Sequence, residues 1–495
     1  MSTTSTSTSG LRKKNSSGIQ VASNDPRLRT QLGEVNTGPK SQAGNALDLV
    51  RGRCRWASFN TPAVISATRK VTGYVLNGRA PKIDLPAVID PEDEIADRFA
   101  EWAETADRDG RSFIEALNAI EADRMAAGEM FVRINRPRNL DREIGFTLLE
   151  SEFVPSYETA AATRSPNSEV VDGVEMNPNT GRILAYHVYR THPGDSLMSG
   201  IIGSITSPDR LARIPARDIL HRINAKRIGS HRGLPVVAPA VIPAADLAAL
   251  MANHLVQSRN ASSVSAILTA ANPSEGLDGD IDLTDDLSDY SDLADRIISN
   301  GWFQGMVATL PPGVGLDMKT HGQPADMAGF TKVTMSFLAQ VLGVPAFLLS
   351  EDYGAVNHSG GRIGLTDFEN SLTDIRESLR SQVLSPLFKI WIDREVLAGR
   401  MDPAIGEACK RLHRVHFKTS PLLNAANVGQ AVKADLDLMN AGILSRSEVG
   451  RRHGVELQAQ LDQRLAEETY AGEIGLDFPE PPEAPKGSME GLDDE

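Results

Sequence analysis

Gly343-Val344-Pro345-Ala346-Phe347-Leu348-Leu349 is the centre of the stretch that decides the fold of this chain of 495 residues. Before it, the residue pattern predicts a strand over 305–319 and a helix over 330–342. A polar loop, 350–361, follows the apolar run. Apolar residues at steps of three and four then predict one long amphipathic helix from 362 to about 396. The order of strand, helix, exposed loop and long helix indicates a mechanical part without groups for covalent chemistry.

The bulk composition is typical of a large soluble protein. Hydrophobic residues make up 41% of the chain, and the net charge is −14. Because DNA-binding surfaces depend on Lys and Arg, such an acidic chain is a poor candidate for gripping a phosphate backbone. Cys54 and Cys409 stand far apart without a CxxC pair, so we expect free thiols in the core.

No targeting segment or membrane span is expected from the sequence. The first forty residues are polar and contain no apolar signal segment. No run approaches the roughly 18 apolar residues that a membrane span needs. We therefore expect a protein that is made and assembled in a cytoplasm.

The two ends of the chain differ from its middle. Residues 1–45 are rich in Ser, Thr, Asn and Gly, and residues 471–495 are rich in Pro and acidic residues. Both are expected to be disordered, because they cannot bury enough apolar surface. Helices are expected from about residue 45 and again after Pro62. Five basic residues there are expected to form a solvated face rather than a binding patch: Arg51, Arg53, Arg55, Arg69 and Lys70.

The middle of the chain is predicted to be α+β with an antiparallel sheet. A helix over 113–126 is expected to end at Gly128. A later helix is expected to carry Pro243 in its first turn and to run to about residue 262. Alternating segments predict four strands, over 130–134, 146–149, 171–176 and 183–189, with a hairpin turn at 177–181 before the last.

Motifs for nucleotide binding and zinc hydrolysis are missing: the sequence holds no GxxxxGK[ST], no GxGxxG and no HExxH. Asn357-His358-Ser359-Gly360-Gly361 is one residue away from a GxSxG nucleophile elbow. Asn357 stands where the first glycine belongs, and a polar loop precedes it instead of the required strand. A serine hydrolase that uses Ser359 is kept as an alternative.

Two further near-matches favour structural roles. Asp278, Asp280 and Asp282 imitate the start of a calcium loop, but Leu283 replaces its glycine. His413 and His416 lie three residues apart with no carboxylate or thiol pattern to complete a ligand set. The sequence therefore predicts no catalytic residue, no metal site and no cofactor.

Six short motifs in a fixed order carry a resemblance over about residues 46–470. Their residues are 127–131, 172–188, 213–221, 232–235, 310–313 and 342–362. In this order they resemble the lambda-type portal proteins of tailed bacteriophages. The last motif, Leu342-Gly343-Val344-Pro345 with the asparagine, serine and arginine that follow, is the most specific. His358 stands where an aromatic residue is usual, and Gly360 replaces a small hydroxyl residue.

The resemblance implies a helix-rich α+β portal fold and a ring of about twelve subunits. Such a ring sits at one capsid vertex of the virion and is assembled in the host cytoplasm. Double-stranded DNA is bound without sequence preference and passes through the channel during packaging and ejection. The implied partners are the terminase large subunit, the major capsid or scaffolding protein, and head–tail connector or adaptor proteins, with no membrane.

The resemblance also implies an order of parts. After the N-terminal arm come a wing, a stem helix, a clip, a second stem helix, a tunnel loop, the rest of the wing and a helical crown. The expected ranges are 1–45 for the arm, 46–233 and 361–420 for the wing, 234–262 and 323–343 for the stem helices, 263–322 for the clip, 344–360 for the tunnel loop, 421–470 for the crown and 471–495 for the tail.

Two sets of residues are candidates for function on this basis. The first would face DNA from the tunnel loop: Glu351, Asp352, Tyr353, Asn357, His358, Ser359 and Arg362. The second is an acidic run that would dock partners on the clip by charge complementarity: Asp278, Asp280, Asp282, Asp285, Asp286 and Asp289. A merely soluble acidic loop is an equally good interpretation. A minor head protein or head–tail adaptor is the remaining alternative function.

Overall fold

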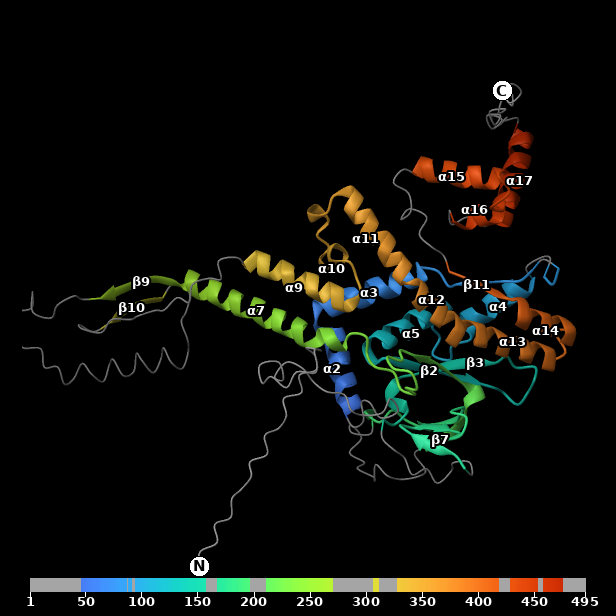
Figure 1. The fold of residues 1–495 in the computed structure, drawn as a ribbon, viewed down its shortest axis with the longest axis horizontal. Helices are drawn as coiled ribbons and strands as arrows, with labels where there is room; N and C mark the ends of the chain where they lie inside the picture. The colour runs from blue at the N-terminus through green and yellow to red at the C-terminus, as the bar shows by residue number, and fades with distance from the viewer. Residues whose placement is uncertain are drawn as a thin grey trace, which may run out of the picture. The chain divides into compact units, whose positions relative to one another are not determined.

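The computed structural model describes residues 46–86, 88–90, 94–156, 167–195, 211–269, 306–310, 327–417, 428–452 and 457–474 (Figure 1). Helices and strands are mixed, with helices in excess, as the sequence predicts. The described residues form two compact units. The small unit takes the residues up to Asp48, Glu152–Ile214 and Ala225–Gly233, and the large unit takes Leu49–Ser151, Pro215–Asn224 and the chain from Leu234 onward.

The large unit opens with four helices: α2 (Leu47–Asn60), α3 (Pro62–Leu76), α4 (Glu94–Thr105) and α5 (Phe113–Ala127). Helix α5 begins with a capping box, in which the backbone N–H of Ser112 donates to the Glu115 carboxylate at 2.9 Å. It ends at Gly128, which has a φ of 88°. A Cβ atom there would lie 2.3 Å from the carbonyl carbon of Leu234, so only glycine fits. The predicted helix and its glycine stop are confirmed.

A three-stranded antiparallel sheet follows, in the order β3 (Gly145–Leu149), β2 (Glu129–Asn135), β8 (Ile219–Ile223). Phe131 in the central strand faces Leu149 on one side and His221 on the other. The strands predicted at 130–134 and 146–149 are confirmed. A separate antiparallel pair joins β1 (Lys82–Asp84) to β11 (Arg414–His416).

An aromatic cluster fixes the helices of the large unit to one another. The Phe99 ring in α4 meets Phe388 edge-on at 5.1 Å between centroids and Trp391 at 5.5 Å. Phe113 and Trp102 complete the cluster. Large buried aromatic side chains contribute most to core energetics, so this contact ties the N-terminal helices to the long helix near the end of the chain.

The long helix predicted over 362–396 is interrupted. It consists of α11 (His358–Ser371), α12 (Thr373–Leu379), the π-helical turn η8 (Arg380–Leu384) and α13 (Ser385–Leu397). Pro386 explains part of the interruption, because it has no N–H to bond to the carbonyl four residues earlier. In the π turn just before it, the backbone hydrogen bonds span five residues instead of four, which accommodates the missing donor. The prediction of a single regular helix was therefore wrong, although its apolar stripe is buried.

The π turn also receives a buried arginine. Arg222 in β8 donates to the Gln382 side chain at 3.0 Å and to the Ser378 hydroxyl at 2.7 Å. The same guanidinium pairs with Glu121 at 2.7 Å, and Arg124 holds the other oxygen of that carboxylate at 2.7 Å. Burial raises the pKa of the Glu121 carboxyl, but the two arginines outweigh it, so its pKa lies below the usual value.

Two of the five basic residues expected on a solvated face pair with buried acidic residues instead. Arg51 is fully buried in α2 and pairs with the buried Glu129 carboxylate at 2.5 Å. His221 approaches the other oxygen of Glu129 at 3.1 Å. Arg55 likewise pairs with Asp123 at 2.6 Å. The prediction was wrong for these two residues, because the acidic partners lie on α5 and β2, far away in the sequence.

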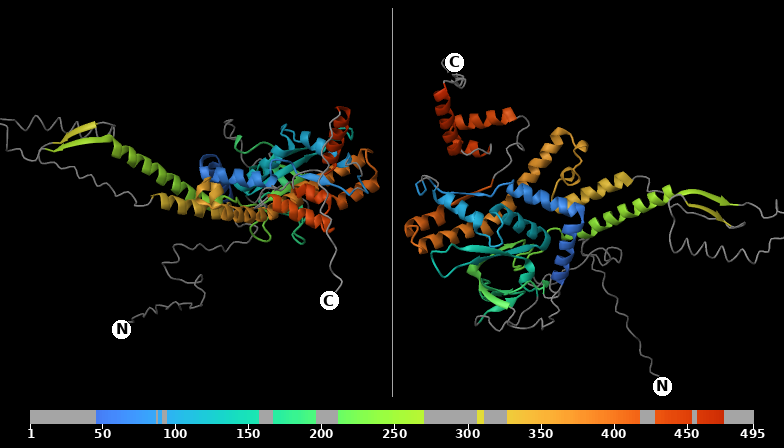
Figure 2. Two further views of the ribbon diagram at one scale, coloured as in Figure 1. Left: turned by 90° about the horizontal axis from the view of Figure 1, so that it is seen from above. Right: turned by 180° about the vertical axis from the view of Figure 1, so that it is seen from behind.

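Helices α7 (Ala238–Ser263) and α9 (Met327–Leu342) of the large unit lie side by side (Figures 1 and 2). Both predicted helices are confirmed. Pro243 lies inside α7 rather than in its first turn, because the helix already begins at Ala238. Strand β9 (Val264–Thr269) continues from α7 and pairs in parallel with β10 (Met306–Leu310), which confirms the start of the strand predicted at 305–319. Residues 311–319 lie outside the described ranges.

The loop predicted at 350–361 is shorter than expected. The apolar run ahead of it forms a short helix, α10 (Ala346–Ser350), and a 3-10 turn, η7 (Tyr353–Ala355), occupies its middle. Helix α11 already begins at His358, because Asn357 caps it: the Asn357 side chain accepts a hydrogen bond from the Gly360 N–H at 2.7 Å. Helix α14 (Pro403–Leu412) closes this part of the large unit.

The small unit is a four-stranded sheet in the order β4 (Glu169–Val171), β5 (Val174–Met176), β6 (Ile183–Tyr189), β7 (Leu211–Pro215). The single strand predicted over 171–176 is wrong. Asp172 and Gly173 have φ angles of 51° and 76°, so they form a tight turn between two antiparallel strands. The hairpin between β5 and β6 is confirmed, with the Asn177 side chain accepting from Asn179 N–H at 2.9 Å.

A buried charge centre holds this sheet together. The fully buried Glu175 carboxylate accepts two bonds from Arg213, at 2.7 and 3.1 Å. The Nε2 atom of His187, also buried, lies 3.2 Å from the same carboxylate, while its Nδ1 atom has no hydrogen-bond partner. Burial lowers the pKa of His187, and the bond to Glu175 opposes this only in part.

Three helices form the C-terminal part: α15 (Val428–Asn440), α16 (Arg446–Arg452) and α17 (Leu457–Ile474). They confirm helical structure in the region predicted as helical. Helix α17 continues past residue 470, so the predicted disordered tail does not begin at 471. The N-terminal arm and residues 475–495 lie outside the described ranges.

Candidate functional site

The outer surface of the α7–α9 pair is unusually apolar. The inner sides of the two helices are buried in the core, with Ala244 and Leu247 from α7 and Leu338 from α9. Large apolar side chains that are between 42% and 71% exposed lie on both helices: Ile242, Met251, Leu255 and Val256 on α7, and Phe330, Val333 and Phe337 on α9. Met251 and Leu255 continue the side of α7 that carries Leu247, beyond the part that the core covers. Large apolar side chains gathered on an exposed helix pair mark an interaction site. We refer to it as the helix-pair face.

Charges on the helix-pair face are few and opposite. Over its described side chains, α7 exposes one acidic residue, Asp246, and α9 exposes one basic residue, Lys332. The exposed side of α7 also carries small residues, Ala245, Ala248 and Ala252, while α9 carries the aromatic ones. The two helices therefore present different surfaces: α9 has the exposed aromatic side chains and a lysine, and α7 has exposed alanines, aliphatic side chains and an aspartate.

One stretch of α7, Ala238–Val256, is long and apolar enough to cross a membrane, judged by length and composition alone. Only 17% of it is buried within the chain. One such helix is weak evidence for a membrane. The exposed part of its outer side contributes to the helix-pair face, which gives the same apolar composition another explanation.

The loop after α9 is fastened at its base to helix α3. Glu351 adopts a left-handed conformation, with a φ of 56°. Its carboxylate lies 3.1 Å from Lys70 and 3.6 Å from Arg69. The Ser66 hydroxyl donates to the Leu349 carbonyl at 3.5 Å. The sequence did not predict these ion pairs, because Arg69 and Lys70 are far from Glu351 along the chain and no local pattern connects them.

The other predicted loop residues are divided between the loop and the helix after it. Asp352 and Tyr353 are exposed, and the Tyr353 ring meets Phe347 edge-on at 6.5 Å between centroids. His358, Ser359 and Arg362 lie in the first turns of α11, behind the Asn357 cap. The structure thus keeps the predicted residues in one continuous segment, with Glu351 at its start.

Ser359 does not stand on a nucleophile elbow. An elbow requires a serine between a strand and a helix, in a sharp turn. Here Ser359 is the second residue of α11, and the residues before it form a 3-10 turn rather than a strand. The geometry therefore argues against the hydrolase alternative.

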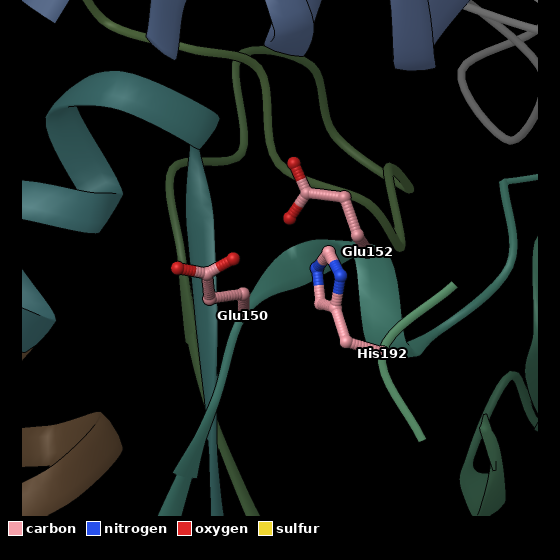
Figure 3. Close-up of side chains that lie close together, drawn as sticks. All are labelled: Glu150, Glu152 and His192. Carbon is pink, nitrogen blue, oxygen red and sulfur yellow. The ribbon is translucent and has the colours of Figure 1, made fainter. Parts of the chain in front are cut away.

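Glu150, Glu152 and His192 bring possible metal-ligand atoms within 4.8 Å of one another (Figure 3). Glu150 is exposed and lies 3.7 Å from Arg55. The Nδ1 atom of His192 accepts from the Gly194 N–H at 3.1 Å, and its ring packs against Phe153. Exposed acidic groups often gather without an ion. We assign no metal site to these three residues, which come from different compact units.

Two further predictions about single residues can be checked, for the cysteines and for the two neighbouring histidines. Cys54 and Cys409 are free and buried, as predicted, and burial raises the pKa of Cys54 to about 11. His413 caps the end of α14, while His416 lies 3.2 Å from Asp84. These contacts agree with structural roles for both histidines. The acidic run from Asp278 to Asp289 lies outside the described residues.

The chain therefore combines a helix pair that exposes apolar side chains with a loop that is held in place by an ion pair. Exposed apolar surface of this kind is typical of proteins that bind other proteins. The profile of the lambda family of phage portal proteins matches residues 25–376. This chain belongs to that family. The proteins of this family are structural.

Solved structures similar to this chain come from gene transfer agent particles. A chain from the neck of the native particle, computed with C12 symmetry, is 13% identical, with a TM-score of 0.39 over 87% of this chain and 98% of that one. A chain from the virion of the native particle is 15% identical, with a TM-score of 0.39 over 86% and 97%. No curated protein sequence matches the chain. Membership of the portal family therefore rests on the family match.

Proposed function

We propose that this chain is the subunit of a portal ring at one vertex of a phage capsid. About twelve copies would surround a channel through which double-stranded DNA is packaged and later ejected. In this proposal α7 and α9 are the stem helices, 263–322 is the clip, and residues 46–233 and 361–420 are the wing. Residues 344–360 are the tunnel loop and 421–470 the crown. The protein acts in the virion, after assembly in the host cytoplasm.

The helix-pair face is the observation that carries the proposal. Burying exposed Phe, Met and Leu side chains gives about 25 cal/mol per Å² of apolar surface removed from water. A second copy supplies a matching surface, because the alanines of α7 can accept Phe330 and Phe337 of its neighbour. Asp246 of one copy and Lys332 of the next provide opposite charges for the same contact.

The contact joins two different surfaces, so it is head-to-tail. A head-to-tail contact repeats from copy to copy and closes into a ring when the rotation allows it. Two identical patches would instead give a closed dimer. The exposed aromatic side chains and Lys332 of α9, and the alanines and Asp246 of α7, make the two surfaces different, which favours a ring.

The net charge is compatible with a channel that does not hold DNA tightly. A ring of about twelve chains at −14 each would carry roughly −168 charges, facing DNA with one charge per about 1.7 Å. A wall with strong positive charge would retain the DNA. An acidic or mixed wall lets it slide, and binding without base contacts has no sequence preference.

The tunnel loop would meet the DNA from its fastened position on α3. Glu351 holds the base of the loop, and Tyr353 projects with 58% of its surface exposed. Asn357 starts the helix that supports the loop from the other end. In the proposal, Asp352, Tyr353 and Arg362 lie nearest the channel.

The remaining partners are assigned to the clip and the wing. The acidic residues from Asp278 to Asp289 would dock the terminase large subunit and later the head–tail connector proteins by charge complementarity. The wing would contact the major capsid or scaffolding protein. This part of the proposal rests on the family resemblance and on the charge of the sequence alone.

Solution mass with negative-stain images tests the ring. The purified full chain should appear as rings of about twelve copies with a central hole. A compact monomer that stays monomeric at high concentration contradicts the proposal. If α7 were instead a membrane span, the chain would partition into detergent or vesicles and would not assemble in their absence.

A deletion tests the loop separately. Removing residues 351–358 should leave the ring intact and reduce DNA packaging in a reconstituted head. Glu407→Gln, on the exposed surface of α14, is the matched control and should package normally. If the deletion prevents subunit folding, the loop is part of the core and its assignment is wrong.

Two other functions make different predictions. A serine hydrolase would lose activity in Ser359→Ala and would react with a serine-directed probe, whereas a portal subunit does neither. A head–tail adaptor would bind an existing ring without forming one. The long helix pair favours the portal, because adaptors are usually shorter and lack it.

A further inference from the structure

Helix α2 exposes a stripe of side chains that is separate from the helix-pair face. Four exposed residues follow one another at steps of four, three and three, so they share one side of the helix: Leu49, Arg53, Trp56 and Phe59. Trp56 is 58% exposed and Phe59 is 79% exposed. The opposite side of α2 is buried at Cys54 and Ala57. We refer to the four exposed residues as the α2 stripe.

The composition of the α2 stripe indicates what can cover it. Tryptophan is enriched at the centres of binding interfaces, where it supplies a large contact area. Arg53 is the only exposed charged residue of α2 from Leu49 onward, and it has no ion-pair partner among the described residues. An arginine that becomes buried without a partner is costly. A surface that covers this stripe should therefore combine an apolar side chain with carboxylates that can meet Arg53.

Helices α11 and α12 carry a surface of this kind. Their inner side packs on α3, where the Phe368 ring meets Tyr74 edge-on at 5.2 Å between centroids. Their outer side exposes four residues at steps of four, three and four: Ile363, Asp367, Asn370 and Asp374. We refer to these as the α11–α12 stripe. Ile363 is 69% exposed, and neither aspartate has an ion-pair partner within the part of the chain that the structure describes.

The two stripes match in length and are opposite in charge. At 1.5 Å per residue, the α2 stripe is about 15 Å long and the α11–α12 stripe about 16 Å. When the two helices run antiparallel, Phe59 lies opposite Ile363, and Arg53 lies between Asp367 and Asp374. Helix α17 also exposes leucines and carboxylates, but its Glu468 already pairs with Arg464 at 2.9 Å. The α11–α12 stripe is therefore the better complement.

The α2 stripe lies near the start of α7. Arg51 of α2 donates to the Ala127 carbonyl at 3.0 Å. Val236, two residues before α7, donates to the carbonyl of Met125 in the same turn, also at 3.0 Å. The α11–α12 stripe instead follows the end of α9, to which α10 connects it. In Figure 1, α2 accordingly lies on the α7 side of the helix pair and α11 on the α9 side, with α3 between them.

This placement suits a contact between neighbouring copies. In the proposed ring, α9 of one copy meets α7 of the next in a head-to-tail contact, which repeats with the same rotation around the ring. The rotation that brings α9 to the neighbouring α7 also brings the α11–α12 stripe toward the neighbouring α2 stripe. The two contacts are then parts of one interface.

We propose that the α11–α12 stripe of one copy docks antiparallel on the α2 stripe of the next copy in the ring. Arg53 lies between Asp367 and Asp374 of the neighbour, and the contact covers Trp56 and Phe59. The helix that follows the loop is thereby supported by the adjacent subunit. This inference rests on the proposed function, because it needs a ring, and it adds a second contact to the one that the helix-pair face makes.

Hydroxyl-radical footprinting of the purified full chain tests whether α2 is covered. Oxidation of Trp56 and Phe59, read by mass spectrometry, should be at least about fivefold slower in rings than in unassembled subunits separated by size exclusion, because a residue at the centre of an interface is shielded from solvent. Leu397, which is 65% exposed on α13, is the reference and should react equally in both fractions. Rings in which Trp56 reacts as fast as in subunits overturn this proposal.

Charge reversal tests the pairing itself. Arg53→Glu faces the two aspartates with a third carboxylate and should raise the protein concentration for half-assembly at least about tenfold. Asp367→Lys with Asp374→Lys should have a similar effect, because both lysines then face Arg53. The three substitutions together restore opposite charges and should assemble within about threefold of the wild type. Arg108→Glu and Glu101→Lys, exposed outside both stripes, are the matched controls and should assemble like the wild type.

The outcomes separate this proposal from the ring itself. Protection of Trp56 without rescue in the combined variant means that a different element of the neighbour covers α2, so the α11–α12 stripe is not the occupant. Rings with a reactive Trp56 leave the α2 stripe to an external protein. Both results contradict the inference and keep the ring. A wild-type chain that never assembles overturns the ring and this contact with it.

Discussion

Single residues in this protein show how buried charge is neutralised. Arg51, Glu121, Glu129 and Arg222 are almost fully buried, and each has a partner of opposite charge within 2.7 Å. A buried ion that loses its partner costs far more than the pair contributes, because the remaining charge has no water around it. The same pairs also join elements that are far apart in the sequence.

Glu121→Ala should therefore be strongly destabilising. It leaves both Arg124 and Arg222 buried without their carboxylate, which should cost about 3–5 kcal/mol of unfolding free energy. Urea denaturation measures the change. Glu377→Ala is the matched control, because Glu377 pairs with Arg380 at the surface and its loss should cost less than about 1 kcal/mol. Equal losses in the two variants would show that the Glu121 centre is solvated.

The small unit should lose stability in mild acid through His187. Burial lowers the pKa of this histidine, so the unfolded chain binds the proton more readily than the folded one. The contribution of neutral His187 is complete above the ordinary histidine pKa and declines as the pH falls below it. Thermal melts between pH 7.5 and 5 should therefore shift downward.

His187→Gln is the comparison for that pH effect. Its amide can still donate to Glu175, but it takes up no proton in this range. Its melting temperature should fall less between pH 7.5 and 5 than that of the wild type. Parallel pH profiles for the two proteins would rule out His187 as the source.

At the scale of elements, the segment from α9 to α13 determines how the loop is presented. At its start the loop is held by Glu351, whose carboxylate pairs with Lys70 of α3. At its end it is held by Asn357, which caps α11. Behind it, the π turn η8 holds Arg222 of the sheet. The interruption of the long helix at η8 is thus a point of attachment to the rest of the large unit.

Asn357→Ala should loosen the start of α11. Loss of the side-chain bond to the Gly360 N–H leaves an unpaired donor at the helix end, at a cost of about 1 kcal/mol. Hydrogen exchange of residues 358–361 should become faster, with the rest of α11 unchanged. Asn357→Asp keeps an acceptor at the same place and should behave like the wild type. Faster exchange throughout α11 to α13 would mean that the cap supports the whole helix.

At the scale of the whole molecule, the helix-pair face is an exposed apolar surface within the described residues. It consists of exposed apolar side chains from two helices that carry opposite charges. Family membership and this surface together support assembly through copies of the same chain. Leu49, Trp56 and Phe59 on α2 are exposed as well and form a different surface.

Phe337→Asp should weaken ring assembly. The substitution places a charge in the middle of the proposed contact, where it would be buried without a partner. Light scattering after size exclusion should show smaller species at concentrations where the wild type forms rings. Leu397→Asp is the control, because Leu397 is 65% exposed on α13, away from the helix pair. Rings of unchanged mass in Phe337→Asp would place the subunit contact elsewhere.

The sequence by itself determined the regular elements and the family. Helix α5 with its Gly128 stop, strands β2, β3 and β6, and helices α7 and α9 follow from apolar spacing and from the residues at their ends. These patterns depend on neighbours within one or two turns, so they are readable in one chain. The motif around Leu342–Arg362 identified the lambda portal family, which the family match confirms.

Only the tertiary structure decided which charges are buried and where the long helix is interrupted. Arg51 and Glu129 are 78 residues apart, and Arg222 and Glu121 are 101 apart, so no local pattern connects them. The fastening of Glu351 to Lys70 and the exposure of Trp56 likewise depend on how distant segments pack. Local spacing fixes the form of each element, whereas the partner of a buried charge or an exposed ring is fixed by folding, which brings distant residues together.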